Sequence, residues 1–277
     1  MKPKNIVKRL PLYTCIGVAL VIMLYPIFWI FMTSIKPFDE IVANPPHALP
    51  QSPTLSNYSL LLDTNLPLNF WNSIFVAVFT ILGIIILSAL AAYPISKMRF
   101  RGRKVIKNII MVGIMVPITV SLIPMFSIYN SIGLINSRWA VIFPQWGFAI
   151  PVSMFLCLAF LNDLPDSLIE AGYIDGAGSL RIFWSIVLPM MRNTIATIAI
   201  FQFVFVWNEF VLARTFLISA DVRTVPLGLA SFVTEVGRRD WGLTFAGVAA
   251  TVLPTLIVFF ILNKQVIKGM AAGAVKG

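Results

Sequence analysis

Few side chains in this sequence could make or break covalent bonds. His47 is the only histidine, so a histidine-based catalytic group or zinc site is not expected. Cys15 and Cys157 both lie inside apolar runs, which argues against a disulfide and a metal site. The sequence contains no Gly-x-x-x-x-Gly-Lys-Ser/Thr loop, so any ATP that drives this protein must be bound by another chain. We therefore expect a protein that is not an enzyme, with no metal ion and no cofactor of its own.

A few polar side chains lie inside otherwise apolar runs, where such a group is by default a candidate for function. Gln202 and Glu209 are spaced for one face of a helix. From Arg192 to Glu209 a helix covers roughly 26 Å, which places Glu209 near its far end. Gln145 and Trp146 could reach the same cavity, with the indole against a ring and the amide bonding hydroxyl groups. The alternative, favoured for any single residue, is that tryptophans anchor the interface and amides join helices. The candidate substrate path is Gln145, Trp146, Gln202, Asn208 and Glu209.

The segment 164–189 is the most carboxylate-rich stretch between two long apolar runs, and its pattern predicts two short helices with a break. Pro165 suits a first helical position, because its missing N–H would be unpaired there. Glu170 follows within the opening turns, where the helix dipole favours negative charge. Asp175-Gly176 ends this helix, since Gly accepts a left-handed conformation. Ser179 is expected to cap the second helix.

This segment resembles a known signature. Glu170-Ala171-Gly172, three residues, Gly176, nine residues and Ile186-Val187-Leu188-Pro189 are similar to the EAA signature of ATP-binding-cassette (ABC) importer permeases. The sequence departs from it at Gly172, where a second alanine is usual. The resemblance implies that 164–189 is a cytoplasmic coupling helix that docks into a groove on a separate ATPase subunit.

The residue types in this segment suit such docking. Small residues would let the helix approach a groove closely, and carboxylates could meet basic groups at its rim. Closure of an ATPase dimer, which would bind ATP and Mg, would then rock the membrane helices between inward-open and outward-open states. The expected coupling residues are Glu170, Ala171, Gly172, Asp175, Gly176 and Ala177.

Composition independently indicates an integral membrane protein. The 277 residues are 58% hydrophobic and 12% charged, about half the charged fraction of a soluble domain. The first apolar run is too long for a signal-peptide core and lacks a cleavage site, so we expect it to be retained. We predict an all-α, polytopic fold with one permease domain over 1–277. The six expected transmembrane helices are about 12–35, 70–96, 105–128, 139–161, 193–212 and 243–264.

The distribution of basic residues predicts the orientation. With this topology, fifteen Lys and Arg residues fall on the side of the termini and six on the other side. The positive-inside rule makes the richer side cytoplasmic. This also explains the net charge of +10 better than a nucleic-acid partner would. Both termini are therefore expected in the cytoplasm, with the protein in a bacterial cytoplasmic membrane.

Other stretches resemble the carbohydrate branch of these permeases. The segment 36–69 is rich in proline, which favours an extended, stiffened outer loop; it could touch an external partner or be a plain spacer. The stretches that carry the resemblance are Thr33–Lys36, Pro53–Tyr58, Val206–Phe210, Asp240–Gly242 and the closing run Gly269–Gly277.

The resemblance implies a permease subunit that imports a sugar, most simply an oligosaccharide. It would work with a second permease in a heterodimer, an ABC ATPase dimer and an extracytoplasmic sugar-binding protein. The alternatives are an ABC permease for another polar solute such as glycerol phosphate, an ion-driven secondary transporter, and a membrane enzyme. A secondary transporter usually needs ionisable groups near the bilayer midplane, and Glu209 alone is a candidate. A membrane enzyme would need a nucleophile–base or metal constellation, which the sequence does not show.

Overall fold

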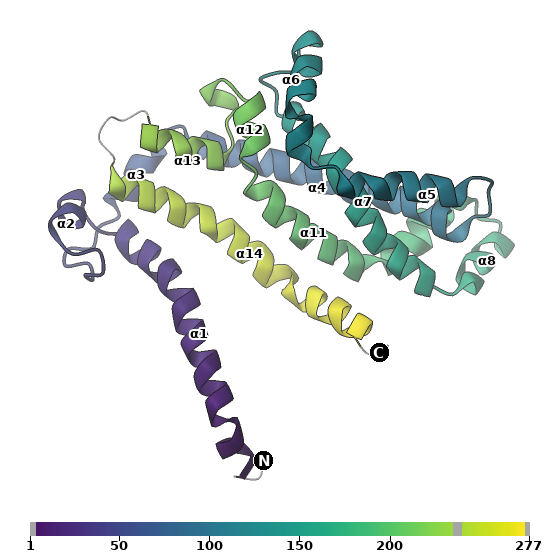
Figure 1. Cartoon of the computed structure of the whole chain (residues 1–277), viewed down its shortest axis with the longest axis horizontal. Helices are drawn as coiled ribbons and strands as arrows, with labels where there is room; N and C mark the ends of the chain where they lie inside the picture. The colour runs from purple at the N-terminus through teal and green to yellow at the C-terminus, as the bar shows by residue number, and fades with distance from the viewer. Residues whose placement is uncertain (1–3, 235–239, 275–277) are drawn as a thin grey trace. The chain divides into compact units, whose positions relative to one another are not determined.

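The computed structural model describes residues 4–234 and 240–274, and over these residues the regular structure is entirely helical (Figure 1). Lys2, Arg238, Arg239 and the last three residues of the closing run lie outside the described residues. The α-helices are α1 (Lys4–Ser34), α2 (Phe38–Ala43), α3 (Ser56–Leu62), α4 (Leu66–Lys97), α5 (Arg103–Val112), α6 (Leu122–Ser131), α7 (Trp139–Asp163), α8 (Asp166–Ile174), α9 (Ser179–Ile182), α10 (Leu188–Met190), α11 (Arg192–Trp207), α12 (Val211–Phe216), α13 (Val225–Thr234) and α14 (Trp241–Ala274). Three 3-10 turns, η1 (Gly113–Met115), η2 (Ile118–Ser121) and η4 (Ala220–Val222), and one π-helix, η3 (Phe183–Val187), complete the described elements.

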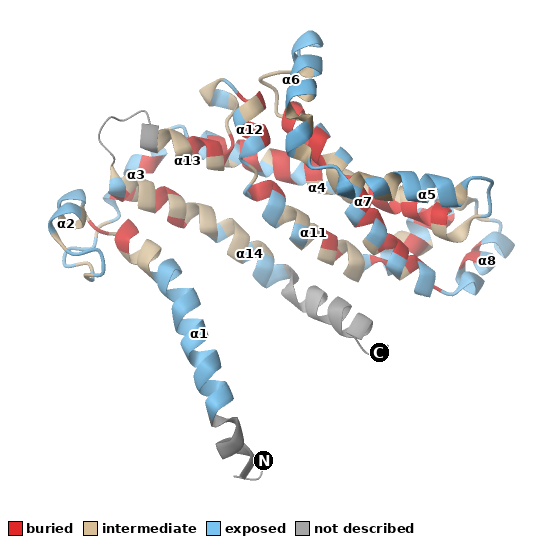
Figure 2. Cartoon of the chain, in the orientation of Figure 1, coloured by how far each residue is buried: buried red, intermediate tan, exposed pale blue. Residues whose placement is uncertain are grey.

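Four helices are long and apolar enough to cross a membrane. They cover Pro11–Ser34, Leu66–Lys97, Trp139–Asp163 and Trp241–Ile261, which confirms four of the predicted spans to within a few residues at most ends. None of the most apolar stretch of α1 is buried within the chain (Figure 2). Such a helix is stable where lipid or another subunit covers it.

The span predicted over 105–128 is not one straight helix, because the chain bends by 90° between residues 103–115 and 118–131. The bend lies at Val116, whose backbone is extended (φ −88°, ψ 113°). Pro117 explains this, since proline has no N–H to continue the ladder and disfavours the helical conformation in the residue before it. If each bent pair counts as one span, the described chain has up to six.

The predicted helix over 193–212 is also corrected at its end. Helix α11 stops at Trp207, and α12 begins only at Val211. On its other side, α11 is bent by 73° from the helical stretch 179–190, so these two form the second bent pair. The residues between α11 and α12 therefore belong to a helix break and not to a helix face.

By its internal contacts the chain divides into two compact units, and each is described by itself. One comprises Met1–Pro67 with Leu229–Leu253, and the other comprises Leu68–Gly228 with Pro254–Gly277. We call them the loop unit and the bundle unit. The single permease domain over 1–277 stays a prediction.

In the loop unit, the expectation of an extended loop over 36–69 is wrong for Phe38–Ala43 and Ser56–Leu62, which form α2 and α3, whereas residues 44–55 contain no helix. Pro37 stands directly before α2, a position that proline tolerates because the N–H there would be unpaired. The Glu40 carboxylate accepts hydrogen bonds from the backbone N–H groups of Gln51 and Ser52 (2.7 and 3.2 Å). Lys36 is buried and donates to the carbonyl of Ala48.

Three of the stretches that resemble carbohydrate permeases meet in this unit. The buried amide of Asn57 donates to the carbonyls of Ser34 and Lys36 (2.9 and 2.8 Å). The Tyr58 hydroxyl and the Ser34 hydroxyl lie 2.7 Å apart. Gly242 packs directly on Asn57, where a Cβ would come within 2.6 Å of the amide oxygen. These short motifs therefore have a structural reason, since together they fold the segment onto the end of α1.

The bundle unit is organised by two buried apolar clusters, seen as red segments in Figure 2. In the first, Ile84 of α4 and Met154 of α7 belong to the same cluster as Phe183 of η3. Leu164 and Ile169 belong to this first cluster too. Packing among these side chains therefore positions the start of α8 on the bundle.

Candidate functional site

The predicted coupling segment forms a compact turn of helices at one end of the bundle unit, where α8 lies beside the ends of α4 and α7 (Figure 1). Helix α8 is preceded by Pro165, one position earlier than we predicted for this residue. Asp166 lies in its first turn, where the helix dipole favours a carboxylate. The segment is thus helical from its first residue after the proline.

Helix α8 ends as the sequence predicted. Gly176 has a left-handed backbone (φ +77°), which a residue with a Cβ adopts at a cost. The N–H of Gly176 donates to the carbonyl of Tyr173 and the N–H of Ala177 to that of Gly172, both at 3.0 Å. This pair of bonds is the Schellman motif, which satisfies carbonyls at the end of a helix.

The second helix differs from the prediction in its cap and its course. Gly178, not Ser179, occupies the cap position, and the Ser179 hydroxyl lies 2.9 Å from that of Tyr173. After α9 the chain widens into η3 and returns to α10. Pro189 supplies the reason, since it cannot donate to the carbonyl four residues earlier and its ring crowds that carbonyl.

The six expected coupling residues do not share one face. Glu170, Ala171, Asp175 and Gly176 are exposed, and Ala177 is half-buried. Gly172 is buried instead: a Cβ there would lie 3.0 Å from the Ile182 side chain and 3.2 Å from that of Ile186. The departure from the usual alanine therefore allows α8 to pack closely on η3 and α9.

Two exposed apolar side chains accompany the acidic ones. Ile174 at the end of α8 is 85% exposed, and Leu180 in α9 is 68% exposed. Large aliphatic groups in this position are typical of surfaces that another protein covers. The sequence analysis missed them, although two large aliphatic residues in a polar segment are a signal that could have been used.

Lys97 ties α8 to the end of α4, which no sequence pattern revealed. Its side chain, 6% exposed, donates to the carbonyl of Leu164 at 2.5 Å and pairs with the Asp166 carboxylate at 2.6 Å. The hydrogen bond from Lys97, followed by its charge, lowers the pKa of Asp166 below the usual value. Asp166 is therefore ionised at neutral pH, and the first turn of α8 is held by a fixed cation.

Three candidate path residues make hydrogen bonds in the bundle unit, and those of Trp146 and Gln202 join two helices. The buried Gln145 donates to the Val141 carbonyl of its own helix (3.0 Å). The Trp146 indole N–H lies 3.1 Å from the Thr80 carbonyl of α4, and a Cβ on Gly83 would overlap the ring. Gln202 is half-buried, and its amide reaches the Ser153 hydroxyl at 3.3 Å. Trp146 and Gln145 thus have structural partners, whereas Gln202 keeps a long contact across α7 and α11.

The placement of Gln202 and Glu209 on one helix face is wrong, because α11 ends between them. The Glu209 carboxylate accepts hydrogen bonds from the backbone N–H groups of Leu212 and Ala213 (2.7 and 3.0 Å). It therefore caps α12. Asn208 is exposed, and its amide donates to the Val204 carbonyl (2.8 Å). The break thus satisfies its own polar groups.

A cavity of about 490 Å³ adjoins α11 in the bundle unit, but it is lined by apolar residues such as Val78, Phe203 and Pro254. It offers no hydroxyl, amide or charge to a polar solute. This cavity therefore does not by itself provide a binding site for a polar solute.

Comparisons with known proteins agree with the helical architecture. A family model described as "Binding-protein-dependent transport system inner membrane component" matches residues 84–271. The diacetylchitobiose uptake system permease protein NgcG of Streptomyces coelicolor is 32% identical over 91% of this chain and 84% of its own length. The galactooligosaccharides transport system permease protein GanQ of Bacillus subtilis is 30% identical over 100% of this chain and 99% of its own.

A solved structure shares the fold. It is described as the crystal structure of a bacterial ABC transporter involved in the import of the acidic polysaccharide alginate. The match has a TM-score of 0.84 at 24% identity and covers 95% of this chain and 98% of that one. The all-α, polytopic permease fold predicted from the sequence is confirmed.

Proposed function

The chain belongs to the family of binding-protein-dependent transport system inner membrane components, and we propose that it imports a sugar as the permease subunit of an ABC importer. The proposal rests on the exposed side chains of α8 and on the fixed turn that follows this helix. It presents Glu170 and Asp175 together with Ile174 at the surface, on a turn fixed by Gly176 and by Lys97. A docking element requires exposed side chains, here acidic and apolar ones, on a backbone that is held in one conformation.

The partner for this surface is an ATPase subunit that carries the nucleotide site. Ile174 and Leu180 would fill its groove while the carboxylates meet cations at the rim, so that apolar burial and charge complementarity act together. Closure of two ATPase subunits would push on α8. Because Leu164 and Ile169 belong to the same apolar cluster as residues of α4 and α7, that push would reach both spans.

We infer that α8 and both termini face the cytoplasm. Fifteen of the chain's Lys and Arg residues fall on this side in the predicted topology, as the positive-inside rule requires. The Lys97–Asp166 pair supports the inference, because it places α8 at the same end of α4 as the basic connection 97–107. The location would be the cytoplasmic membrane of a bacterium.

The cargo is an oligosaccharide, delivered by an extracytoplasmic binding protein to this chain and a second permease. The relatives named for diacetylchitobiose and galactooligosaccharides support this class of cargo. The cavity beside α11 is lined by apolar residues, which supports a polar site shared with the second permease. Gln202 is the residue of the candidate path that is best placed to contribute, because its hydrogen bond to the Ser153 hydroxyl is long (3.3 Å).

Reconstitution tests the proposal. The chain would be copurified with its ATPase and second permease and placed in vesicles with the binding protein. We expect ATP hydrolysis to rise when the binding protein is loaded with an oligosaccharide, and labelled sugar to accumulate only with ATP. Uptake that follows an ion gradient without ATP would contradict it and favour a secondary transporter.

A further inference from the structure

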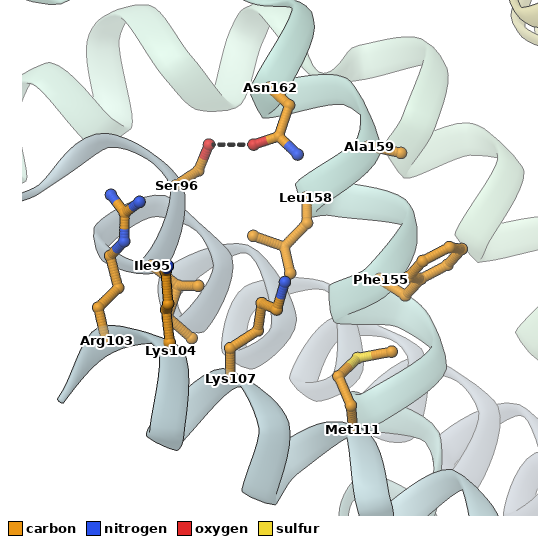
Figure 3. Close-up of a pocket in the computed structure, with 10 residues that line it drawn as sticks. All are labelled: Ile95, Ser96, Arg103, Lys104, Lys107, Met111, Phe155, Leu158, Ala159 and Asn162. Carbon is orange, nitrogen blue, oxygen red and sulfur yellow. Dashed lines mark hydrogen bonds between the residues drawn. The ribbon is translucent and has the colours of Figure 1, made fainter.

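A basic cavity of about 530 Å³ lies at the same end of the bundle unit as α8, between the end of α4, the start of α5 and the last turns of α7. Figure 3 shows its lining, with the long side chains of α5 facing residues of α7. A cavity of this volume is in the range of ligand pockets. It is lined by Ile95, Ser96, Arg103, Lys104, Lys107, Met111, Phe155, Leu158, Ala159 and Asn162.

One half of this cavity is cationic. Arg103, Lys104 and Lys107 come from the first turns of α5, and residues three and four apart share a helix face. Arg103 donates to the Met98 carbonyl at 3.3 Å, which fixes its guanidinium group at the rim. Neither lysine has a carboxylate partner among the described residues, and the ion pair at this end of the bundle unit joins Lys97 to Asp166. The cavity therefore gathers three cationic side chains, and among the described residues neither of its lysines forms an ion pair.

Two uncharged groups complete the polar side. The Ser96 hydroxyl of α4 donates to the Asn162 side-chain oxygen of α7 at 3.0 Å (Figure 3). This bond orients the Asn162 amide, whose N–H groups can donate to a further acceptor. Cations and amide donors together suit a phosphate group, which has several strong acceptor oxygens.

The other half of the cavity is apolar. Met111, Leu158 and Ala159 line it, and Phe155 of the span α7 is 54% exposed beside them. A free inorganic anion would leave this wall in contact with water, and an acidic peptide would place polar backbone against it. A phospholipid suits both halves, because its phosphate and its acyl chains meet at such a boundary.

We propose that this cavity binds the phosphate headgroup of an anionic phospholipid, with the acyl chains lying along Phe155 and Met111. Lys104 and Lys107 hold the charge, and Asn162 donates to a phosphate oxygen. Basic pockets between helices at the membrane surface bind lipid headgroups in this way. The site lies at the same end of the bundle unit as α8, so bound lipid would stabilise the ends of α4 and α7 beside α8.

Native mass spectrometry of the full chain, purified with its copurifying subunits, tests the proposal. The probes are dioleoyl phosphatidylglycerol and dioleoyl phosphatidylcholine, which have the same acyl chains and differ in headgroup charge. We expect phosphatidylglycerol to bind more tightly, and Lys104→Gln with Lys107→Gln to weaken it by about fivefold per lysine. Arg99→Gln with Arg101→Gln is the matched control, because it removes two exposed charges of the same connection that do not line the cavity.

Four outcomes would overturn the proposal. Equal binding of the two lipids would show that headgroup charge does not determine binding. Equal weakening by both double variants would show non-specific attraction to the basic surface and not binding in the cavity. Displacement of phosphatidylglycerol by millimolar inorganic phosphate would assign the cavity to a free anion. A cross-link from Lys104 to a carboxylate of a copurified subunit would assign it to a protein partner. Binding that survives in the charge-preserving pair Lys104→Arg and Lys107→Arg supports the lipid site.

Discussion

Adding a side chain at Gly176 should weaken coupling to the ATPase, whereas the same change two residues later should not. Gly176 has φ +77°, while Gly178 has φ −72° and ψ 161°. A Cβ at either position would meet nothing within 4 Å. Gly176→Ser and Gly178→Ser therefore differ in backbone strain and not in space. Ser also suits the cap position that Gly178 occupies.

The magnitude follows from the left-handed backbone. A residue with a Cβ pays about 1–2 kcal/mol there, which reduces the population of the native turn by roughly 5–30-fold relative to opened forms. The Schellman bonds from Gly176 and Ala177 would open first, and the exposed end of α8 would lose its fixed direction. We expect weaker copurification of the ATPase and lower sugar-stimulated hydrolysis, with normal amounts of the chain in the membrane.

A rescue variant separates strain from loss of the glycine itself. Gly176→Asn should lie close to wild type, because Asn tolerates the left-handed region better than Ser. The assay is ATP hydrolysis in vesicles with a sugar-loaded binding protein, measured for the three variants side by side. Equal activity of Gly176→Ser and Gly178→Ser would refute the reasoning, since the turn would then not matter for docking.

Three further predictions follow from the contacts. Lys97→Met should leave the buried Leu164 carbonyl without a donor, at a cost of about 1–3 kcal/mol. The thermal unfolding temperature and the rate of ATP hydrolysis should therefore both fall. Unchanged values would show that α8 does not depend on the Lys97 contacts. Glu209→Ala should lower stability by about 0.5–2 kcal/mol through loss of the α12 cap, whereas Gln202→Ala should lower uptake at unchanged stability, and normal uptake would return Gln202 to a structural role. In a background without cysteine, Gly102→Cys should resist a membrane-impermeant maleimide added to intact cells, and labelling from outside would reverse the orientation.

The sequence predicted the helices where apolar runs are long and unbroken, as in α4 and α7. The prediction failed where single residues end the helix inside an apolar run. Pro117 breaks the stretch 105–128, and α11 ends at Trp207, where the polar residues Asn208 and Glu209 interrupt the apolar run. In the segment 36–69 the sequence predicted no helix where short helices form. Proline is tolerated next to the start of a helix, and it removes a helical hydrogen bond only in the interior.

The site was predictable to the extent that it depends on local chemistry. The left-handed turn at Gly176 is a property of that residue and its neighbours, so the sequence sufficed. The burial of Gly172 depends on its packing against other helices. The contacts of Lys97 with Leu164 and Asp166 join residues that are distant in sequence. No spacing rule reports such contacts. The same holds for the basic cavity, whose walls come from three helices.

The central claim is that α8 couples this chain to an ATPase, and charge reversal at Glu170 tests it most directly. Glu170 is exposed and has no hydrogen bond or ion pair with another described side chain, so Glu170→Lys should fold normally. Asp63→Lys is the control, a charge reversal at another exposed carboxylate at the end of α3. We predict that Glu170→Lys loses ATPase copurification and sugar-stimulated hydrolysis while the binding protein still captures sugar, and that Asp63→Lys keeps both. Wild-type copurification and hydrolysis in Glu170→Lys would contradict the claim.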